Sequence, residues 1–262
     1  MHKQVLVILL VCMVVGLIGA SSIKIRSVSQ QKAKLSPSPI QIVQSALYTN
    51  DRLTPLATPL QWKQRMGNLN AKVVLDSSTK YQKILGFGCA LTESAAYTFR
   101  TMKPDVQKNI IDMFWTAKGL NYTMARIHMN ACDFSLDNYS CDDVAGDYQL
   151  ENFNIDRDRV FVLPLIKTVL QQVKSSYPNN GESFRIFLSP WSPPAWMKYN
   201  QHMDGSALPN GLINSSLIMD SWALHFSKFV TAYKKEGVDR MWGLTVQNEP
   251  GKFYGPYVMT SL

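Results

Sequence analysis

Short apolar runs alternate with longer amphipathic segments along the chain from about residue 81 onward. The short runs are rich in β-branched and aromatic residues, and in the longer segments apolar residues recur every three or four positions. Strands that alternate with helices at this spacing predict parallel β/α units. The predicted strands are 83–91, 121–130, 183–190 and 240–250.

Three helical segments separate these strands. The first opens at Pro104 and ends at Gly119, the second has Pro164 in its first turn, and the third ends at Gly237. The loops that follow the strands are long and polar, and one of them runs to about Arg159. This asymmetry favours an α/β fold of the (β/α)₈ TIM-barrel type, with only the first four β/α units present. A doubly wound sheet is the alternative, but no GxGxxG loop that could bind a nucleotide occurs.

The first 20 residues do not belong to this pattern. Lys3 precedes an apolar run from Val5 to Ile18 that is broken only by Gly16, and small residues follow it. That is the layout of a secretory signal peptide, and the run is short for a membrane anchor. We therefore expect a signal peptide over 1–20, a polar arm over 21–80 and the β/α region over 81–262.

A secretory route changes how asparagine and cysteine residues are interpreted. Sequons for N-glycosylation, which can carry glycans in the secretory pathway, occur at Asn121, Asn138 and Asn214. Asn138 and Asn214 lie in polar loops and are better candidates than Asn121, which directly precedes an apolar strand-like run. Cys132 and Cys141 lie nine positions apart across a loop. They could pair in an oxidising compartment or could both remain thiols.

Composition and charge narrow the classes of function. Hydrophobic residues make up 46% of the 262-residue chain and charged residues 18%, which is typical of a globular protein. The 27 Lys and Arg residues exceed the 19 Asp and Glu residues, giving a net charge of +8. Because this surplus is spread along the chain without a run of five basic residues, it suits an anionic membrane surface or an acidic lipid. Nucleic acid is not an expected partner.

Residues that could carry chemistry follow the predicted strands. The fourth strand is followed by Asn248 and Glu249. The strand would fix Glu249 at the mouth of a barrel, where partial burial would keep it protonated and able to donate to a leaving oxygen. The amide of Asn248 could bind a sugar hydroxyl.

The other strand ends could supply binding groups. Trp191 and Trp196 offer flat faces on which a sugar ring can stack, and Asp133 can accept hydrogen bonds from sugar hydroxyls. Arg126 could hold a carboxylate in its ionised form. Each residue also has an ordinary structural interpretation: the tryptophans could pack in the core, and Glu93 could cap the helix that it opens. The combination at four successive strand ends favours a carbohydrate site.

Four segments carry a resemblance to a known family. GFGCALTES, RIHMNACDFS, LSPWSPPAWMK and LTVQNEP resemble, in this order, the strand-end motifs of glycoside hydrolase family 30, and especially those of its lysosomal acid glucosylceramidases. The resemblance implies a (β/α)₈ barrel with a β-rich side domain built from both chain ends, to which the N-terminal arm would belong. It implies a retaining β-glucosidase that hydrolyses glucosylceramide to glucose and ceramide. The roles that it implies are acid/base for Glu249, contact with the sugar 2-hydroxyl for Asn248, sugar binding for Asp133 and Trp191, a place on the same wall for Phe134, and support of the nucleophile for Arg126.

The resemblance also implies that half of the catalytic machinery lies elsewhere. A retaining glycosidase needs two carboxylates roughly 5–5.5 Å apart. The family's nucleophile is a Glu near the end of the seventh strand, and only four strands are predicted. We therefore expect the nucleophile beyond Leu262 and expect the 262-residue polypeptide to be inactive alone.

Partners and alternatives follow from the same resemblance. No metal or organic cofactor is implied, because two carboxylates and water suffice for this chemistry. The implied partners are glucosylceramide or another β-glycoside, an anionic membrane surface and a small saposin-like activator protein, in the lysosomal lumen or the extracellular space. Cys89, Glu93 and the polar arm depart from the family pattern. This leaves open an exo-acting β-glycosidase on xylan or glucan, or a truncated protein that binds carbohydrate or lipid without catalysis.

Overall fold

The chain divides into two compact units, residues 1–80 and 81–262. In the first unit, β1 (Val43–Gln44) pairs with β2 (Thr54–Pro55) in an antiparallel ribbon. A computed structural model of the chain describes residues 42–57, 76, 78–177, 181, 183–205 and 209–250. The expected signal peptide and most of the polar arm lie outside these described residues.

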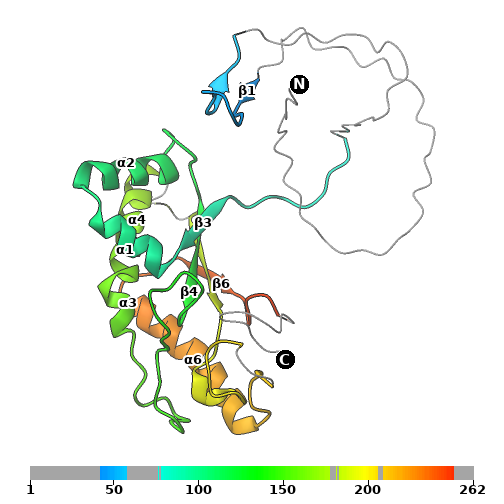
Figure 1. The fold of residues 1–262 in the computed structure, drawn as a ribbon, viewed down its shortest axis with the longest axis vertical. Coiled ribbons are helices and arrows are strands. Elements are labelled where there is room, and N and C mark those ends of the chain that lie inside the picture. The colour runs from blue at the N-terminus through cyan, green and yellow to red at the C-terminus, as the bar shows by residue number, and fades with distance from the viewer. Residues whose placement is uncertain are drawn as a thin grey trace, which may run out of the picture. The chain divides into compact units, whose positions relative to one another are not determined.

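The second unit is built on one sheet of four parallel strands (Figure 1). The spatial order of the strands is their order in the chain, as expected for consecutive β/α units. All four predicted strands are present, each shorter than its apolar run. They are β3 (Gly88–Leu91), β4 (Met124–Met129), β5 (Arg185–Pro190) and β6 (Met241–Leu244).

Helices connect each strand to the next. Pro104 opens the second of them as predicted, because proline lacks the N–H that has no partner at a helix start. One short helix, α3, lies in a segment that was expected to be a loop. The helices are α1 (Glu93–Thr101) and α2 (Pro104–Trp115) before β4, α3 (Asp156–Val160) and α4 (Val162–Ser176) before β5, and α6 (Ser216–Lys235) before β6, with a 3₁₀ turn η1 (Ala195–Met197) after β5.

The hydrophobic core lies between the sheet and these helices, which gather on one side of it (Figure 1). Alternate strand residues such as Ile127 and Leu188 are buried against the helical layer. The residues that alternate with these along the strands, such as Arg126 and Ser189, form the polar contacts of the site described below. One helical layer on a parallel sheet is the arrangement of successive units of a (β/α)₈ barrel. Within the described residues the sheet is not closed, and β3 and β6 are its edges.

The structure selects one of the two alternatives for the cysteines. Cys89, Cys132 and Cys141 are free thiols, and the last two are buried. Burial raises the pKa of Cys132 to about 11, so that its thiol stays protonated at neutral pH. Across the described ranges, no helix combines the length and the apolar character that crossing a membrane would need.

Gln107 caps the end of α1 from the first turns of α2. Its Nε2 donates to the carbonyl oxygens of Phe99 and Met102, at 3.0 Å each, beside the helix's own bond from Met102 N to Phe99 O. We expect Gln107→Ala to lower the free energy of unfolding by about 1–2 kcal/mol in a urea titration. Gln171→Ala, at an exposed position of α4, should change it by less than about 0.5 kcal/mol. Equal losses in the two variants would contradict the capping role.

Candidate active site

Arg126 joins three strand ends. It lies on β4, and its Nη2 donates to Ser189 Oγ and to Asn248 Oδ1, both at 2.7 Å. Ser189 belongs to β5 and Asn248 follows β6. Because the strands are parallel and in register, their carboxyl ends meet at one edge of the sheet. The structure therefore brings together Arg126 and Asn248, which lie 122 positions apart in the chain.

Aromatic rings flank this arginine. Its Cζ lies 4.2 Å from the ring centroid of Trp191 and 5.7 Å from that of Phe187. A guanidinium over an aromatic face is attracted by the ring quadrupole and holds the ring in place. Trp191 is half-buried, and its carbonyl oxygen accepts a hydrogen bond from Gln247 Nε2 at 3.3 Å. An indole fixed in this way can offer its exposed surface to a sugar ring.

The segment after β6 is bound to the end of β5. The backbone N–H of Thr245 donates to Leu188 O and that of Asn248 donates to Pro190 O, both at 2.9 Å. These bonds extend the strand pairing and deliver Glu249 to the same edge. Glu249 has a φ of 45°, a left-handed conformation that costs free energy for a non-glycine residue. Such strained residues cluster at functional sites.

Two carboxylates lie in the electrostatic field of Arg126. Burial lowers the pKa of Arg126, while Coulomb attraction to Cys132, Asp133 and Glu249 opposes that effect. The Nε atom of Arg126 is buried and has no hydrogen-bond partner within the described residues. A cation with an unused donor, two nearby carboxylates, an amide and an indole therefore share one region.

Glu249 differs from expectation in its burial. Partial burial was predicted, but the side chain is exposed. The physical reason is that β6 is the edge strand of the described sheet, so that Glu249 is covered from the β5 side at most. Asp133 is exposed as well, and so is Phe134, which exposes 58% of its surface.

The loop that carries Asp133 and Phe134 is anchored to the start of α1. Phe134 O accepts a hydrogen bond from Ser94 N at 2.9 Å. Leu136 N donates to Glu93 Oε2 at 2.8 Å. Glu93 was considered as a helix cap, but Thr92 is the cap of α1 and Glu93 holds this loop instead. This anchoring role was missed from the sequence, because the two residues lie 43 positions apart.

Trp196 is not part of the site. The residue is 8% exposed and packs with Met197, Ile218 and Trp222 in a small core cluster. Its Nε1 donates to Asp142 O at 3.0 Å, so both its ring and its polar atom are occupied. The expectation that Trp196 stacks on a sugar is wrong, because the η1 turn directs its ring into the protein.

The three sequon asparagines are all exposed. Asn121 precedes β4 with a φ of 52°, and Asn138 and Asn214 lie in loops. Exposure therefore does not separate the favoured candidates from Asn121. In the part of the chain that the structure describes, no group of three or more His, Cys, Asp or Glu side chains is arranged to hold a metal ion.

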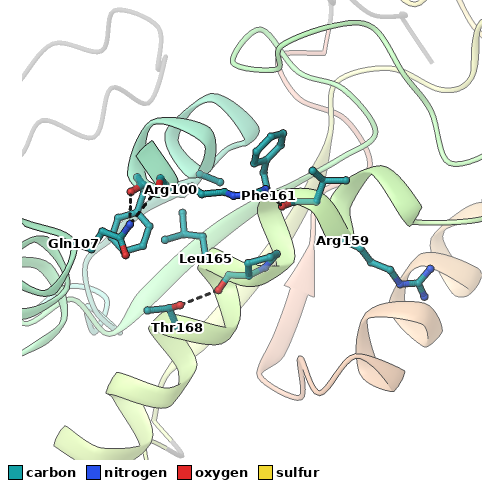
Figure 2. Close-up of a pocket in the computed structure, with 10 residues that line it drawn as sticks. Arg100, Gln107, Arg159, Phe161, Leu165 and Thr168 are labelled. Carbon is teal, nitrogen blue, oxygen red and sulfur yellow. Dashed lines mark hydrogen bonds between the residues drawn. The ribbon is translucent and has the colours of Figure 1, made fainter. Parts of the chain in front are cut away.

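A cavity of about 560 Å³ lies between α1, α2 and the α3–α4 segment, in the helical layer (Figure 2). Its polar groups already bond to backbone carbonyls, since Arg100 Nη1 donates to Val160 O and Thr168 Oγ1 donates to Pro164 O. Figure 2 shows Arg159 directed away from α1, and its Nε donates to Glu236 Oε1 at 2.8 Å. The lining contains no Asp or Glu that could act as an acid or a base.

Known proteins resemble this chain over the same region. Residues 84–255 match the family of the glycosyl hydrolase family 30 TIM-barrel domain. The chain is 34% identical to mouse lysosomal acid glucosylceramidase over 186 residues, which cover 70% of the chain and 34% of that protein. It is 31% identical to the endo-1,6-β-D-glucanase neg1 of Aspergillus fumigatus over 216 residues, or 77% of the chain and 42% of that protein.

A solved structure shows the same architecture. The crystal structure of SrfJ from Salmonella typhimurium superposes with a TM-score of 0.64 at 27% identity, covering 80% of this chain and 44% of that one. The chain therefore spans well under half the length of the curated relatives just described. The family match covers most of the chain and includes every strand of the four-stranded sheet. The chain, with its β/α units of the TIM-barrel type, belongs to glycosyl hydrolase family 30.

Proposed function

We propose that this chain supplies the acid/base half of a retaining β-glucosidase that hydrolyses glucosylceramide. The observation that carries the proposal is the bridge from Arg126 to Asn248, which sets Asn248 beside Trp191 and next to Glu249. The 34% identity to mouse lysosomal acid glucosylceramidase supports this substrate class.

Glu249 acts as the proton donor and then as the base. Its carboxyl group protonates the oxygen of the leaving group, and its carboxylate later takes a proton from the water that releases the sugar. Because Arg126 occupies the amide oxygen of Asn248, the NH₂ group is what Asn248 offers to a sugar hydroxyl. Trp191 stacks on the sugar, Asp133 accepts from its hydroxyls, and Phe134 borders them.

The nucleophile comes from outside these 262 residues. Neither Glu93 nor Asp133 takes that role: Glu93 is 1% exposed and ion-paired to Arg157, and Asp133 is assigned to sugar binding. The Nε of Arg126, which is buried and has no hydrogen-bond partner among the described residues, would favour the ionised form of such a carboxylate.

The place of action belongs to the same proposal. The enzyme enters the secretory pathway through residues 1–20 and works in the lysosomal lumen or outside the cell, with glycans on Asn138 and Asn214. The surplus of basic over acidic residues suits an anionic membrane that presents the lipid, with a small saposin-like protein as activator.

A second candidate is hydrolysis of a β-1,6-glucan. It is favoured by the 31% identity to the Aspergillus endo-1,6-β-D-glucanase. The two substrates share the sugar site and differ in the leaving group, which is a ceramide in one and a second sugar in the other. Comparing release of glucose from glucosylceramide in anionic vesicles with cleavage of a β-1,6-glucan decides between them.

Replacing the acid/base is the central experiment. The assay uses the polypeptide that is encoded by the complete reading frame of the transcript. We expect Glu249→Gln to lower kcat/KM for glucosylceramide about 10²–10⁴-fold, because the leaving oxygen receives no proton. The loss should be much smaller for a dinitrophenyl β-glucoside, whose leaving group needs no protonation.

The same assay provides a control variant and the results that would contradict the proposal. Glu151→Gln, at an exposed loop carboxylate, should stay within about twofold of wild type on both substrates. Equal losses on the two substrates in Glu249→Gln would show that Glu249 is not the proton donor. Absence of β-glycosidase activity in the wild-type protein would overturn the proposed function.

A further inference from the structure

Glu93 is a buried carboxylate, and both of its oxygens accept hydrogen bonds. Its Oε1 accepts from Arg157 Nε at 2.9 Å, and its Oε2 accepts from Arg157 Nη2 at 3.3 Å and from Leu136 N at 2.8 Å. The residue is 1% exposed. Arg157 belongs to α3, and its guanidinium lies 4.5 Å from the ring centroid of Tyr139. One carboxylate thus joins α1, α3 and the loop after β4.

Helix capping does not account for this arrangement. Thr92 already caps α1, since its side chain accepts a hydrogen bond from Ala95 N. Burying a charge costs free energy unless it is paired, and a buried ion pair often stabilises a fold less than apolar side chains of similar volume would. A role in fixing one conformation of the attached loop fits these contacts better than a role in stability alone.

The attached loop, residues 132–136, presents Asp133. Within the loop, Ser135 N donates to Cys132 O at 2.9 Å and Cys132 N donates to Ser135 Oγ at 3.0 Å. Its links to α1 are the bond from Ser94 N to Phe134 O and the bond from Leu136 N to Glu93. The two links lie one and three positions after Asp133 in the chain, so the orientation of Asp133 depends on them.

We infer that Glu93 and Arg157 form a positioning pair that sets Asp133 for its contact with the sugar. The inference rests on the proposed β-glycosidase function. Neither side chain touches the reacting atoms, and both act through the loop. A misplacement of about 1 Å at a group that contacts substrate can cost 10²-fold in rate. Breaking the pair should therefore lower kcat/KM by more than the accompanying loss of folding stability would explain.

A double-mutant cycle tests this on the polypeptide encoded by the complete reading frame. Glu93→Gln keeps the shape of the side chain and removes its charge, and Asp133→Asn removes the acceptor that the pair positions. We expect each single variant to lower kcat/KM for a β-glucoside at least about tenfold. The double variant should be no worse than Asp133→Asn alone, because both changes remove one contact.

A matched variant separates positioning from folding. Gln107→Ala weakens the far end of α1 and should lower the unfolding midpoint while leaving kcat/KM within about twofold. If Glu93→Gln fails to fold, Arg157→Lys replaces it in the cycle with Asp133→Asn. Lysine keeps the positive charge but loses the two hydrogen bonds that arginine makes to Glu93. Effects that multiply in the double variant, or single variants within twofold of wild type, would overturn the inference. A wild-type protein without β-glycosidase activity would instead overturn the proposed function.

Discussion

Replacing Arg126 with methionine is expected to lower kcat/KM for a β-glucoside by at least about 100-fold. Arg126 makes two 2.7 Å hydrogen bonds, to Ser189 and Asn248, and lies 4.2 Å from the ring centroid of Trp191. Methionine fills a similar space but donates no hydrogen bond. The amide of Asn248 would then lose the partner that fixes its orientation, and the indole would lose the cation above it.

Lysine at the same position separates charge from orientation. Arg126→Lys keeps a positive charge near Asp133 and Glu249, but it lacks the planar group that bridges Ser189 and Asn248 and covers the indole. If charge alone matters, this variant keeps most of the activity. We expect it to lose at least about tenfold in kcat/KM, because orientation of Asn248 is the larger effect.

The control for both variants is an arginine on the neighbouring strand. Arg185 also lies over an aromatic ring, at 6.0 Å from Trp242, but at the amino end of β5. Arg185→Met should keep kcat/KM within about twofold. Steady-state kinetics together with circular dichroism would reveal whether any loss reflects unfolding. An Arg126→Met protein with activity within threefold of wild type would contradict the central role of this residue.

Local sequence patterns predict most of this fold. The apolar residues at helical spacing from Ile218 to Tyr233 indicate α6, and Pro104 marks the start of α2. The four apolar runs each become a strand. These signals are local, because a helix or strand that faces a core repeats its apolar residues with the period of its own backbone. The convergence of strand ends also follows, since parallel strands bring their carboxyl ends to one edge.

Contacts between distant residues were beyond such patterns. Four of the five residues of α3 are charged, and the place of this helix depends on partners far away in the chain, such as Glu93 for Arg157. Trp191 and Trp196 could not be told apart either, because both follow the same strand and only the η1 turn buries one of them. Sequence indicated which residues gather after the strands but not which of them face the ligand.

Removing the side chain of Asp158 is expected to lower the free energy of unfolding by about 3–5 kcal/mol, because two buried hydroxyls lose their partner at about 1–3 kcal/mol each. Asp158 is 1% exposed and links two elements through tyrosine hydroxyls. Its Oδ1 accepts from Tyr139 and its Oδ2 from Tyr233, both at 2.7 Å. Asp158→Ala leaves both buried hydroxyls without an acceptor and opens a cavity. Asp156→Ala, at an exposed position of the same helix, should cost less than about 1 kcal/mol.

Asparagine at position 158 separates the charge from the packing. Burial raises the pKa of Asp158 above its ordinary value, although His128 and the two tyrosine hydroxyls act in the opposite direction. Folding therefore favours the neutral carboxyl group. The resulting stabilisation is complete below the unfolded pKa of about 3.9, and it is lost as the pH rises through the folded pKa.

Asp158→Asn resembles the neutral carboxyl group at every pH. The stability difference between wild type and this variant should therefore shrink as the pH rises from about 4 to 7, because only the wild type loses the contribution of the neutral acid. Urea titrations at several pH values measure this difference for both proteins. A difference that widens with pH would mean that the tyrosine hydroxyls hold Asp158 as an anion. An Asp158→Ala loss below about 1 kcal/mol would mean that other contacts, such as the Arg159–Glu236 ion pair, hold α3 against α6.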